Sequence, residues 1–528
     1  LAGEEAARLI KNLLSVRAKS VTKTTSVRGN NIVPLYEIQN SKKKTKSFVD
    51  FQHDVTSDDI RLAHKEGYVS VEHLKRYTTL GMATDGGKVG NVVGLALMAQ
   101  AAGKDISEVG TTTFRPPYTP VSIGALAGRS VGKHFRPLRR TALHEWNLAH
   151  GAVMIETGLW QRPWYYPQSG ESLSEAYIRE SETTRRSVGL CDVSSLGKIA
   201  VQGPDATEFL NRIYTNGFAK LPIGKARYGI MLRDDGLVMD DGTTWRLSET
   251  EYFMTTTTTH AAQVMAWLEE LLQTRWQTLK VNVTSVSDAW AGISISGPKS
   301  RSVFESMSSD IDFFSNANFP FMGVREISLC KGIKCRVARI SFSGELGYEV
   351  YVPADYGPSL MDELWSTAKS LEGCLYGLET LGTLRIEKGH VTGAELDGRV
   401  TLEDAGLGKM ASSKKSFVGS SLRQRPELLR KDRPQLVGIF PRDRRTTFNA
   451  GAILKGVDSS NEWGDGWITA VTHSPELGHW IGLGFISGGH KAWAGKNVAS
   501  LDPVRNRNVD VEIVSPHMVD PDGIRQRG

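Results

Sequence analysis

A strand that ends at Gly-Pro and runs directly into an amphipathic helix occurs twice in this chain. The first copy has strand Lys198–Val201, then Gly203-Pro204, and then a helix with apolar residues at helical spacing. The second copy has strand Gly292–Ser296, Gly297-Pro298 and a helix that contains Val303 and Phe304. Proline suits the first turn of a helix, and glycine permits the sharp turn before it. Two such units predict a duplicated α+β module over residues 145–405.

The remaining segments have different patterns, and 528 residues are too many for one hydrophobic core. Residues 1–46 are expected to be a helix and a hairpin left from an upstream domain, which makes the chain the C-terminal part of a longer protein. Residues 47–110 predict a small helical domain, and 111–144 a proline-stiffened extended connector. Residues 406–528 have strands separated by glycine-rich turns and predict a β-barrel. The expected fold class is therefore α+β and multidomain.

Composition excludes several classes of protein. The net charge of +6 is spread along the chain, so we expect no nucleic-acid partner. The four cysteines form no CxxC pair, and His144 and His150 are six apart, not four as a zinc helix requires. We therefore expect no metal site. No apolar run approaches the ~20 residues that cross a bilayer, so we expect no membrane association and a cytoplasmic location.

Two adjacent acids end an apolar strand in the segment Ile230–Leu247. Asp235-Gly236 is typical of a hairpin turn, and the next strand runs straight into Asp240, Asp241 and Gly242. Successive strand residues point to opposite faces, so one acid of the pair at most can enter a given pocket. The pattern fits a solvated strand end as well as a binding site.

Two further segments carry polar groups on strands. Thr255–Thr259 is a run of five threonines, either an ordinary β-branched strand or a row of hydroxyls that face a heteroaromatic ligand. In Ser341–Tyr351, Glu349 lies between Tyr348 and Val350. A carboxylate there could accept two hydrogen bonds from an amide-plus-amine ring edge, or it could form an ion pair with Arg339.

Several motifs occur together in the order and spacing of one family. They are Gly189–Ser195 (GLCDVSS), Val201–Ala206 (VQGPDA), Gly236–Asp241, Gly344–Glu349 (GELGYE) and Leu384–Gly389 (LRIEKG). Over about 145–528 this pattern resembles the folate-binding aminomethyltransferase fold of the glycine cleavage T-protein. The upstream half, with Ser47–Gly128 and the segment HEWNLAHGAVMIETGLWQRPWYYP, resembles the α subunit of heterotetrameric sarcosine oxidase.

The resemblance implies roles for particular residues. Asp241 matches the catalytic aspartate, and Glu349 matches the glutamate that binds the pterin ring. Thr256 or Thr257 lies on the strand that contacts folate, and Phe342 is expected among the cofactor-binding residues. One departure concerns the folate tail, because Leu381 stands where the T-protein has an arginine.

The resemblance also implies a function. The family oxidises sarcosine at a flavin on a β subunit and yields an imine and hydrogen peroxide. This chain would bind tetrahydrofolate and capture the imine carbon, giving glycine and 5,10-methylenetetrahydrofolate. FAD and FMN are expected on, or at the interface with, the β subunit, NAD in the upstream region, and β, γ and δ subunits as partners. Related amine dehydrogenases hold an iron–sulfur cluster with cysteines in the helical segment. Asp50, Gln52 and Asp85 stand near the expected places of those cysteines, so we expect no cluster. The alternatives are a dimethylglycine-type demethylase, a free-standing aminomethyltransferase and a non-catalytic folate-binding scaffold subunit.

Overall fold

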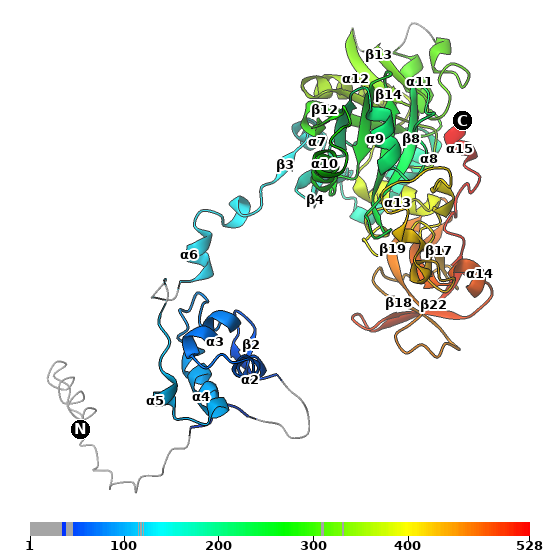
Figure 1. Ribbon diagram of the computed structural model, residues 1–528. Coiled ribbons are helices and arrows are strands. Elements are labelled where there is room, and N and C mark those ends of the chain that lie inside the picture. Colours follow the sequence, from blue (N-terminus) through cyan, green and yellow to red (C-terminus); the bar gives the residue numbers. More distant parts are fainter. Residues whose placement is uncertain are drawn as a thin grey trace, which may run out of the picture. The chain divides into compact units, whose positions relative to one another are not determined.

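The computed structural model describes residues 34–38, 46–114, 116, 119, 121–307, 311–329 and 332–528. The chain divides into two compact units, Leu1–Phe135 and Arg136–Gly528, each described here by itself (Figure 1). The helix and hairpin expected over residues 1–46 lie almost wholly outside the described residues. No helix in the described part of the chain is long and apolar enough to span a membrane.

The first unit is a small helical domain with one short hairpin. Its elements are β1 (Phe48–Asp50), β2 (Val55–Thr56), α2 (Ser57–Lys65), α3 (Val71–Thr78), α4 (Asn91–Ala102), α5 (Ile106–Val109), α6 (Ile123–Ala127) and η1 (Gly132–His134). Thr56 caps α2 in a reciprocal capping box with Asp59. Asp50 accepts hydrogen bonds from the amides of Gln52, His53 and Gly81, so its carboxylate holds two loops together.

The second unit contains two large sheets that carry the repeated motif; both are antiparallel except for the parallel pair β6–β16 in the second. The first sheet has the order β11-β7-β10-β9-β8. Its strands are β7 (Gly197–Gln202), β8 (Lys225–Leu232), β9 (Val238–Arg246), β10 (Glu251–Thr256) and β11 (Asn282–Ser285). Helices α9 (Ala206–Ile213) and α10 (Ala261–Glu270), with the π-helical turn η2 (Leu271–Arg275), pack on one of its faces.

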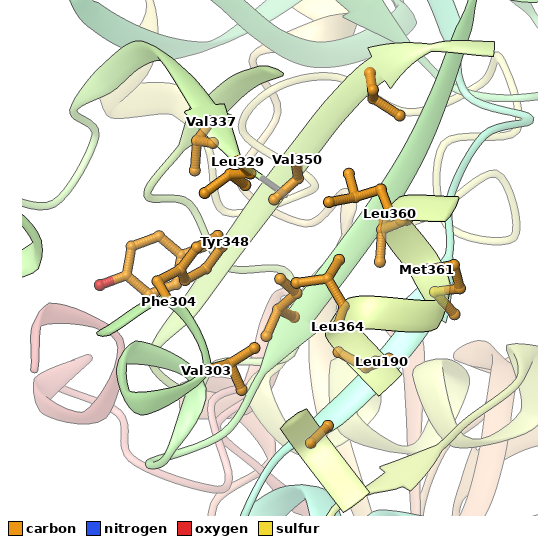
Figure 2. Packing of buried hydrophobic residues seen from close by; sticks show 14 of the residues in the cluster. Leu190, Val303, Phe304, Leu329, Val337, Tyr348, Val350, Leu360, Met361 and Leu364 are labelled. Atoms are coloured by element: carbon orange, nitrogen blue, oxygen red, sulfur yellow. The ribbon is translucent and has the colours of Figure 1, made fainter. Parts of the chain in front are cut away.

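The second sheet has the order β13-β14-β15-β12-β6-β16. Its strands are β6 (Gly189–Asp192), β12 (Trp290–Ser296), β13 (Val324–Leu329), β14 (Ile333–Ala338), β15 (Gly347–Pro353) and β16 (Cys374–Leu375). The neighbouring helices and turns are α8 (Leu173–Arg186), η3 (Ser287–Ala289), α11 (Ser300–Glu305), η4 (Ile311–Phe314), η5 (Ala354–Tyr356) and α12 (Gly357–Ser370). Figure 2 shows Tyr348 and Val350 of β15 among side chains of α11 and α12, which cover one face of the sheet.

The predicted duplication is confirmed in both sheets. β7 runs through Gly203-Pro204 into α9, and β12 runs through Gly297-Pro298 into α11. Both glycines have positive φ, 135° and 127°. A Cβ on Gly203 would lie 2.1 Å from the Lys280 carbonyl oxygen, and one on Gly297 would lie 2.4 Å from that of Ser187. Glycine is therefore required at both turns by conformation and by space.

A smaller sheet precedes the module, and a barrel follows it. The sheet joins β3 (Arg139–Arg140), β5 (Trp160–Tyr165) and β4 (Val153–Thr157), with α7 (His144–Ala149) beside it. The predicted β-barrel is confirmed as a closed ring in the order β17-β20-β19-β18-β21-β22. Its elements are β17 (Pro434–Pro441), β18 (Ile453–Gly456), β19 (Gly466–Ser474), β20 (His479–Ser487), α14 (Gly489–Trp493), β21 (Val498–Asp502) and β22 (Arg507–Val514).

Helix α13 (Leu378–Lys388) connects the barrel to the rest of the second unit, because it contacts both β19 and α8. The barrel is orange and red in Figure 1. The short turns η6 (Gly408–Met410), η7 (Leu422–Gln424) and η8 (Pro426–Leu428) lead into it, and α15 (Ile524–Arg527) lies near the end of the chain.

The two large sheets meet through aromatic side chains on their inner faces. Trp245 and Phe253 of the first sheet contact Tyr351 of the second, each with ring centroids 5.2 Å from that of Tyr351. Residues at even spacing from these aromatics on the same strands share the inner faces. Polar side chains at these positions therefore lie between the two sheets.

Candidate functional site

Asp241 lies on the inner face of the first sheet. The predicted hairpin is present, with Gly236 at φ +89° between β8 and β9. Ile230 is directly opposite Asp241, so Tyr228 lies diagonally across the pair, and its hydroxyl donates to Asp241 Oδ2 at 2.7 Å. Asp241 keeps partial exposure, but burial first and the neighbouring Asp240 second raise the pKa of its carboxyl to about 7.

Asp240 points to the opposite face and has different partners. Its side chain is buried and accepts from the Thr257 hydroxyl at 2.6 Å and the Thr257 amide at 3.2 Å. His260 Nδ1 lies 3.2 Å from Asp240 Oδ1, and this hydrogen bond raises the pKa of His260. Asp240 therefore fixes the turn that follows β10, whereas Asp241 remains reachable.

Glu349 lies on the inner face of the second sheet. Because Tyr348 and Val350 point into the helix-covered core (Figure 2), Glu349 and Tyr351 point the other way. The Tyr351 hydroxyl donates to Glu349 Oε2 at 3.0 Å, and burial raises the pKa of Glu349 to about 7, opposed by that hydrogen bond and by Lys198. The alternative ion pair with Arg339 is absent: Arg339 Nη1 donates to the Phe319 carbonyl oxygen instead.

The other expected cofactor residues, Thr256, Thr257 and Phe342, have partners other than the two inner-face carboxyls. Thr256 is buried, and its hydroxyl donates to the Thr257 carbonyl oxygen at 3.2 Å. Thr257 is held by Asp240. Phe342 is exposed on a loop, where its ring lies against His390 at 5.6 Å, and its contacts connect it to His390 and not to the two inner-face carboxyls.

Thr255 is the threonine of this run that shares the inner face with Asp241. Its side chain bonds Thr243 of the neighbouring strand β9. The Thr255 hydroxyl accepts from the Thr243 amide at 3.0 Å and lies 3.0 Å from the Thr243 hydroxyl. Gly242 makes this approach possible. A Cβ on Gly242 would lie 2.0 Å from the Thr255 carbonyl oxygen.

Lys198 is a buried cation that sequence reasoning missed. It lies opposite Thr255 on β7, and its Nζ donates to the carbonyl oxygens of Ser194 at 2.5 Å and Leu196 at 2.9 Å. Burial lowers its pKa to about 8. Nothing in a single sequence marks a lone lysine in a strand as a site residue. Tyr228 could have been predicted, because the register of the predicted hairpin places it diagonally opposite Asp241.

The remaining expectations concern the folate tail and metals. Leu381 packs against an apolar cluster of Cys191, Val193, Cys374 and Tyr376 and offers no charge to a ligand. Among the residues that the structure describes, no group of three or more His, Cys, Asp or Glu side chains could hold a metal ion.

Comparisons with known proteins agree with this fold. The model of the GCVT N-terminal domain matches residues 143–415, about half of the chain, and the sarcosine oxidase A3 domain matches residues 44–129. The aminomethyltransferase of Halothermothrix orenii is 30% identical over 71% of this chain and 99% of its own length. The solved aminomethyltransferase T of the Bartonella henselae glycine cleavage system shares the fold, with a TM-score of 0.62 and 24% identity over 74% of this chain and 99% of its own.

Two longer relatives match nearly the whole chain. The sarcosine oxidase subunit alpha of Rhizobium meliloti is 47% identical over 99% of this chain and 54% of its own length. That of Corynebacterium sp. strain U-96 is 44% identical over 91% of this chain and 50% of its own. The chain thus spans about half the length of these relatives. It belongs to the GCVT aminomethyltransferase family, and nearly its whole length is similar to one half of the sarcosine oxidase α subunits.

Proposed function

We propose that the space between the two sheets binds tetrahydrofolate and that Asp241 handles the proton during transfer of a one-carbon unit to it. The observation that carries this proposal is the pair of inner-face carboxyls. Asp241 and Glu349 each titrate at about 7, and each has one tyrosine hydroxyl as its hydrogen-bond donor. Carboxyls poised near neutral pH are suited to binding and proton transfer.

Glu349 fits the ring of the cofactor. Its Oε2 accepts from Tyr351, and its Oε1 accepts no hydrogen bond from the residues that the structure describes. An ionised carboxylate has only acceptors, and the pterin ring offers an amide and an amine as adjacent donors. We infer that Glu349 binds this edge. Thr256, Thr257 and Phe342 stay candidates for further contacts with the folate, of which Thr257 keeps partial exposure.

The reaction that fits is capture of an imine carbon. Tetrahydrofolate, when bound, supplies two amine nitrogens. The imine carbon would bridge them as the methylene group of 5,10-methylenetetrahydrofolate. In that reaction the two nitrogens would lose one proton each and the departing glycine nitrogen would gain two, so no proton is left over. Asp241 would accept a proton from one of these nitrogens, and the Tyr228 hydroxyl, which donates to its carboxylate, would orient it.

The similarity to sarcosine oxidase α subunits supports a proposal for the substrate and the partners. We propose that the imine comes from oxidation of sarcosine by a flavin-bearing β subunit, with γ and δ subunits completing the assembly. FAD and FMN belong on, or at the interface with, that β subunit, and NAD belongs to a region upstream of the described residues. A cytoplasmic location is part of the same proposal.

The test is product formation by the chain assembled with its partner subunits. Asp241→Asn should leave sarcosine oxidation nearly unchanged and lower the yield of 5,10-methylenetetrahydrofolate about 100-fold, because loss of a positioned base costs roughly 10²–10⁴ in rate. Asp234→Asn is the matched control, since Asp234 is an exposed acid at the hairpin turn that pairs with Arg275. Equal yield from Asp241→Asn and the control would overturn the catalytic role and leave a folate-binding scaffold.

A further inference from the structure

Arg162 is a buried cation with almost no partners. The residue lies on β5 and is 6% exposed. Its Nη2 donates to the Asp192 carbonyl oxygen at 3.2 Å, and its Nε has no hydrogen-bond partner within the described ranges. No carboxylate of those ranges forms an ion pair with it. Because a guanidinium has five N–H donors and burial without partners is costly, this arrangement needs an explanation beyond packing.

The guanidinium lies beside the row of residues that contains Glu349. Cys191 of β6 pairs with Ser294 of β12, and Ser294 pairs with Glu349 of β15, so the three share one face of the second sheet. Two strand spacings, about 10 Å, separate the ends of this row. The charge of Arg162 lowers the pKa of both the Cys191 thiol and the Tyr351 phenol against the effect of burial, which places it near both.

The surrounding loops connect Arg162 to the first sheet as well. The turn between β4 and β5 approaches the threonine run, because a Cβ on Gly158 would lie 3.3 Å from Thr259 Cγ2. The loop that follows Asp192 reaches the same run, where Ser195 Oγ lies 3.1 Å from Thr258 Oγ1. Arg162 also acts on Tyr351, whose ring packs against Trp245 and Phe253 of the first sheet, so its charge lies on the inner side of the second sheet.

We propose that Arg162 donates hydrogen bonds to the 4-oxo group of the bound pterin ring, next to the donor edge that Glu349 accepts. This inference rests on the proposed folate function and adds a determinant of specificity. Glu349 can only accept, and Arg162 can only donate, so together they match a ring on which two donors adjoin a carbonyl. A ring with an amino group in place of that carbonyl would set donor against donor at Arg162.

The test compares two ligands on the full-length chain by calorimetry. The ligands are tetrahydrofolate and tetrahydroaminopterin, which differ in a 4-oxo or a 4-amino group and therefore in whether N3 donates or accepts. The N3 difference acts at Glu349 and is common to the wild type and every Arg162 variant. The measured quantity is the ratio of their dissociation constants. Arg162→Met should change the wild-type ratio by about fivefold or more in favour of the 4-amino ligand, because it removes a charged hydrogen bond to one ligand and a repulsion from the other. Arg162→Lys, which keeps the charge without the planar fork, should give an intermediate ratio.

Arg139→Met is the matched control, because Arg139 lies on the neighbouring strand β3 with an exposed side chain paired to Asp288. Its ratio should equal that of the wild type. Thermal unfolding distinguishes a binding role of Arg162 from a structural one. If Arg162 serves binding, removing this buried, unpaired cation should leave the Tm of Arg162→Met unchanged or higher. If Arg162 is purely structural, the variant should have a lower Tm and should bind both ligands more weakly by the same factor. An unchanged ratio in both Arg162 variants overturns the assignment alone. Failure of the wild type to bind tetrahydrofolate overturns the folate function and this inference with it.

Discussion

Asp241 and Glu349 titrate near neutrality for the same physical reason, although they lie on different sheets. Each carboxyl is enclosed by aromatic and aliphatic neighbours that disfavour its charged form, and each is partly compensated by one tyrosine hydroxyl. Their surroundings also differ. Asp240 adds a negative charge beside Asp241, whereas Lys198 adds a positive charge near Glu349. The first carboxyl is therefore suited to accepting a proton, and the second is suited to staying ionised when donors bind it.

Replacing Tyr228 by Phe should shift the pH dependence of product formation. The Tyr228 hydroxyl donates to the ionised form of Asp241 and so lowers its pKa; without it, the pKa rises above about 7. A smaller fraction of Asp241 is then ionised at pH 7, and the acid limb of the rate profile should move upward by about 0.5–1 pH unit. The measurement is the pH profile of 5,10-methylenetetrahydrofolate formation.

Tyr252→Phe is the control for this change. Tyr252 lies on the other face of the first sheet, where its hydroxyl is 2.5 Å from that of Thr207. Its profile should coincide with the wild type. An acid limb that stays in place in Tyr228→Phe would mean that a group other than Asp241 governs the profile.

Glu349→Gln should weaken tetrahydrofolate binding with little change in fold. The amide keeps the size of the side chain but replaces a charged acceptor, and a hydrogen bond to a charged group contributes about 1.5–3 kcal/mol. We expect the dissociation constant to rise about tenfold or more by calorimetry. Glu326→Gln, an exposed glutamate on β13 that pairs with Arg336, is the control. Equal affinity of Glu349→Gln and the wild type would exclude Glu349 from the site.

Single residues of this site differ in how well the sequence predicts them. Asp241 and Glu349 stand in short motifs beside turns, so their strands could be predicted. The choice of Asp241 over Asp240, and of a binding role for Glu349 over an ion pair, rests on the family resemblance. Lys198 and Arg162 could not be predicted. Lys198 bonds nearby carbonyl oxygens of Ser194 and Leu196, but no local pattern shows that its ammonium is buried. Arg162 reaches the Asp192 carbonyl oxygen at the end of β6, 30 residues further along the chain.

At the scale of elements, the register between β9 and β10 decides which threonine faces the site. The sequence predicts the hairpin and the threonine strand, but β10 ends at Thr256, and Thr257 belongs to the turn before α10. The side chain of Thr255 therefore reaches the inner face, and that of Thr257 bonds Asp240. No pattern within the run of five threonines distinguishes them, since all five are alike in size and β propensity.

Gly242→Ala should disturb the site through this register. A methyl group would lie 2.0 Å from the Thr255 carbonyl oxygen, so β9 and β10 would have to separate beside Asp241. We expect a lower Tm and weaker tetrahydrofolate binding. Gly382→Ala is the control, because a Cβ there meets nothing within 4 Å inside helix α13, where alanine stabilises by roughly 0.5–1 kcal/mol. A Gly242→Ala protein as stable and as tight-binding as the control would show that the strands do not need this close approach.

At the scale of the whole second unit, a buried ionic network joins segments that belong to different layers. Arg185 of α8 pairs with Glu387 of α13 at 2.5 Å and with Glu345 at 2.8 Å, in the loop before β15. The Ser474 hydroxyl, at the end of β19, donates to Glu387 at 2.5 Å, and Arg525 near the end of the chain pairs with Glu345 at 3.0 Å. The fold class and the barrel are predictable from local sequence patterns. This ionic network is not, because its residues are far apart in the chain, from Arg185 to Arg525.

Arg185→Met should therefore destabilise the second unit far more than its exposure suggests. The change leaves Glu387 and Glu345 buried without their shared cation, and breaking one side of a buried ion pair costs about 3–5 kcal/mol. We expect the apparent Tm to fall by roughly 5 °C or more in a thermal scan. Arg186→Met is a close control: it is the next residue, is exposed, and lies 4.0 Å from Glu182 on the helix surface, where such pairs contribute about 0.3–0.5 kcal/mol. Equal Tm values for the two variants would mean that Ser474 and Arg525 hold the glutamates without Arg185, and that the barrel is joined to the sheets by apolar packing along α13 alone.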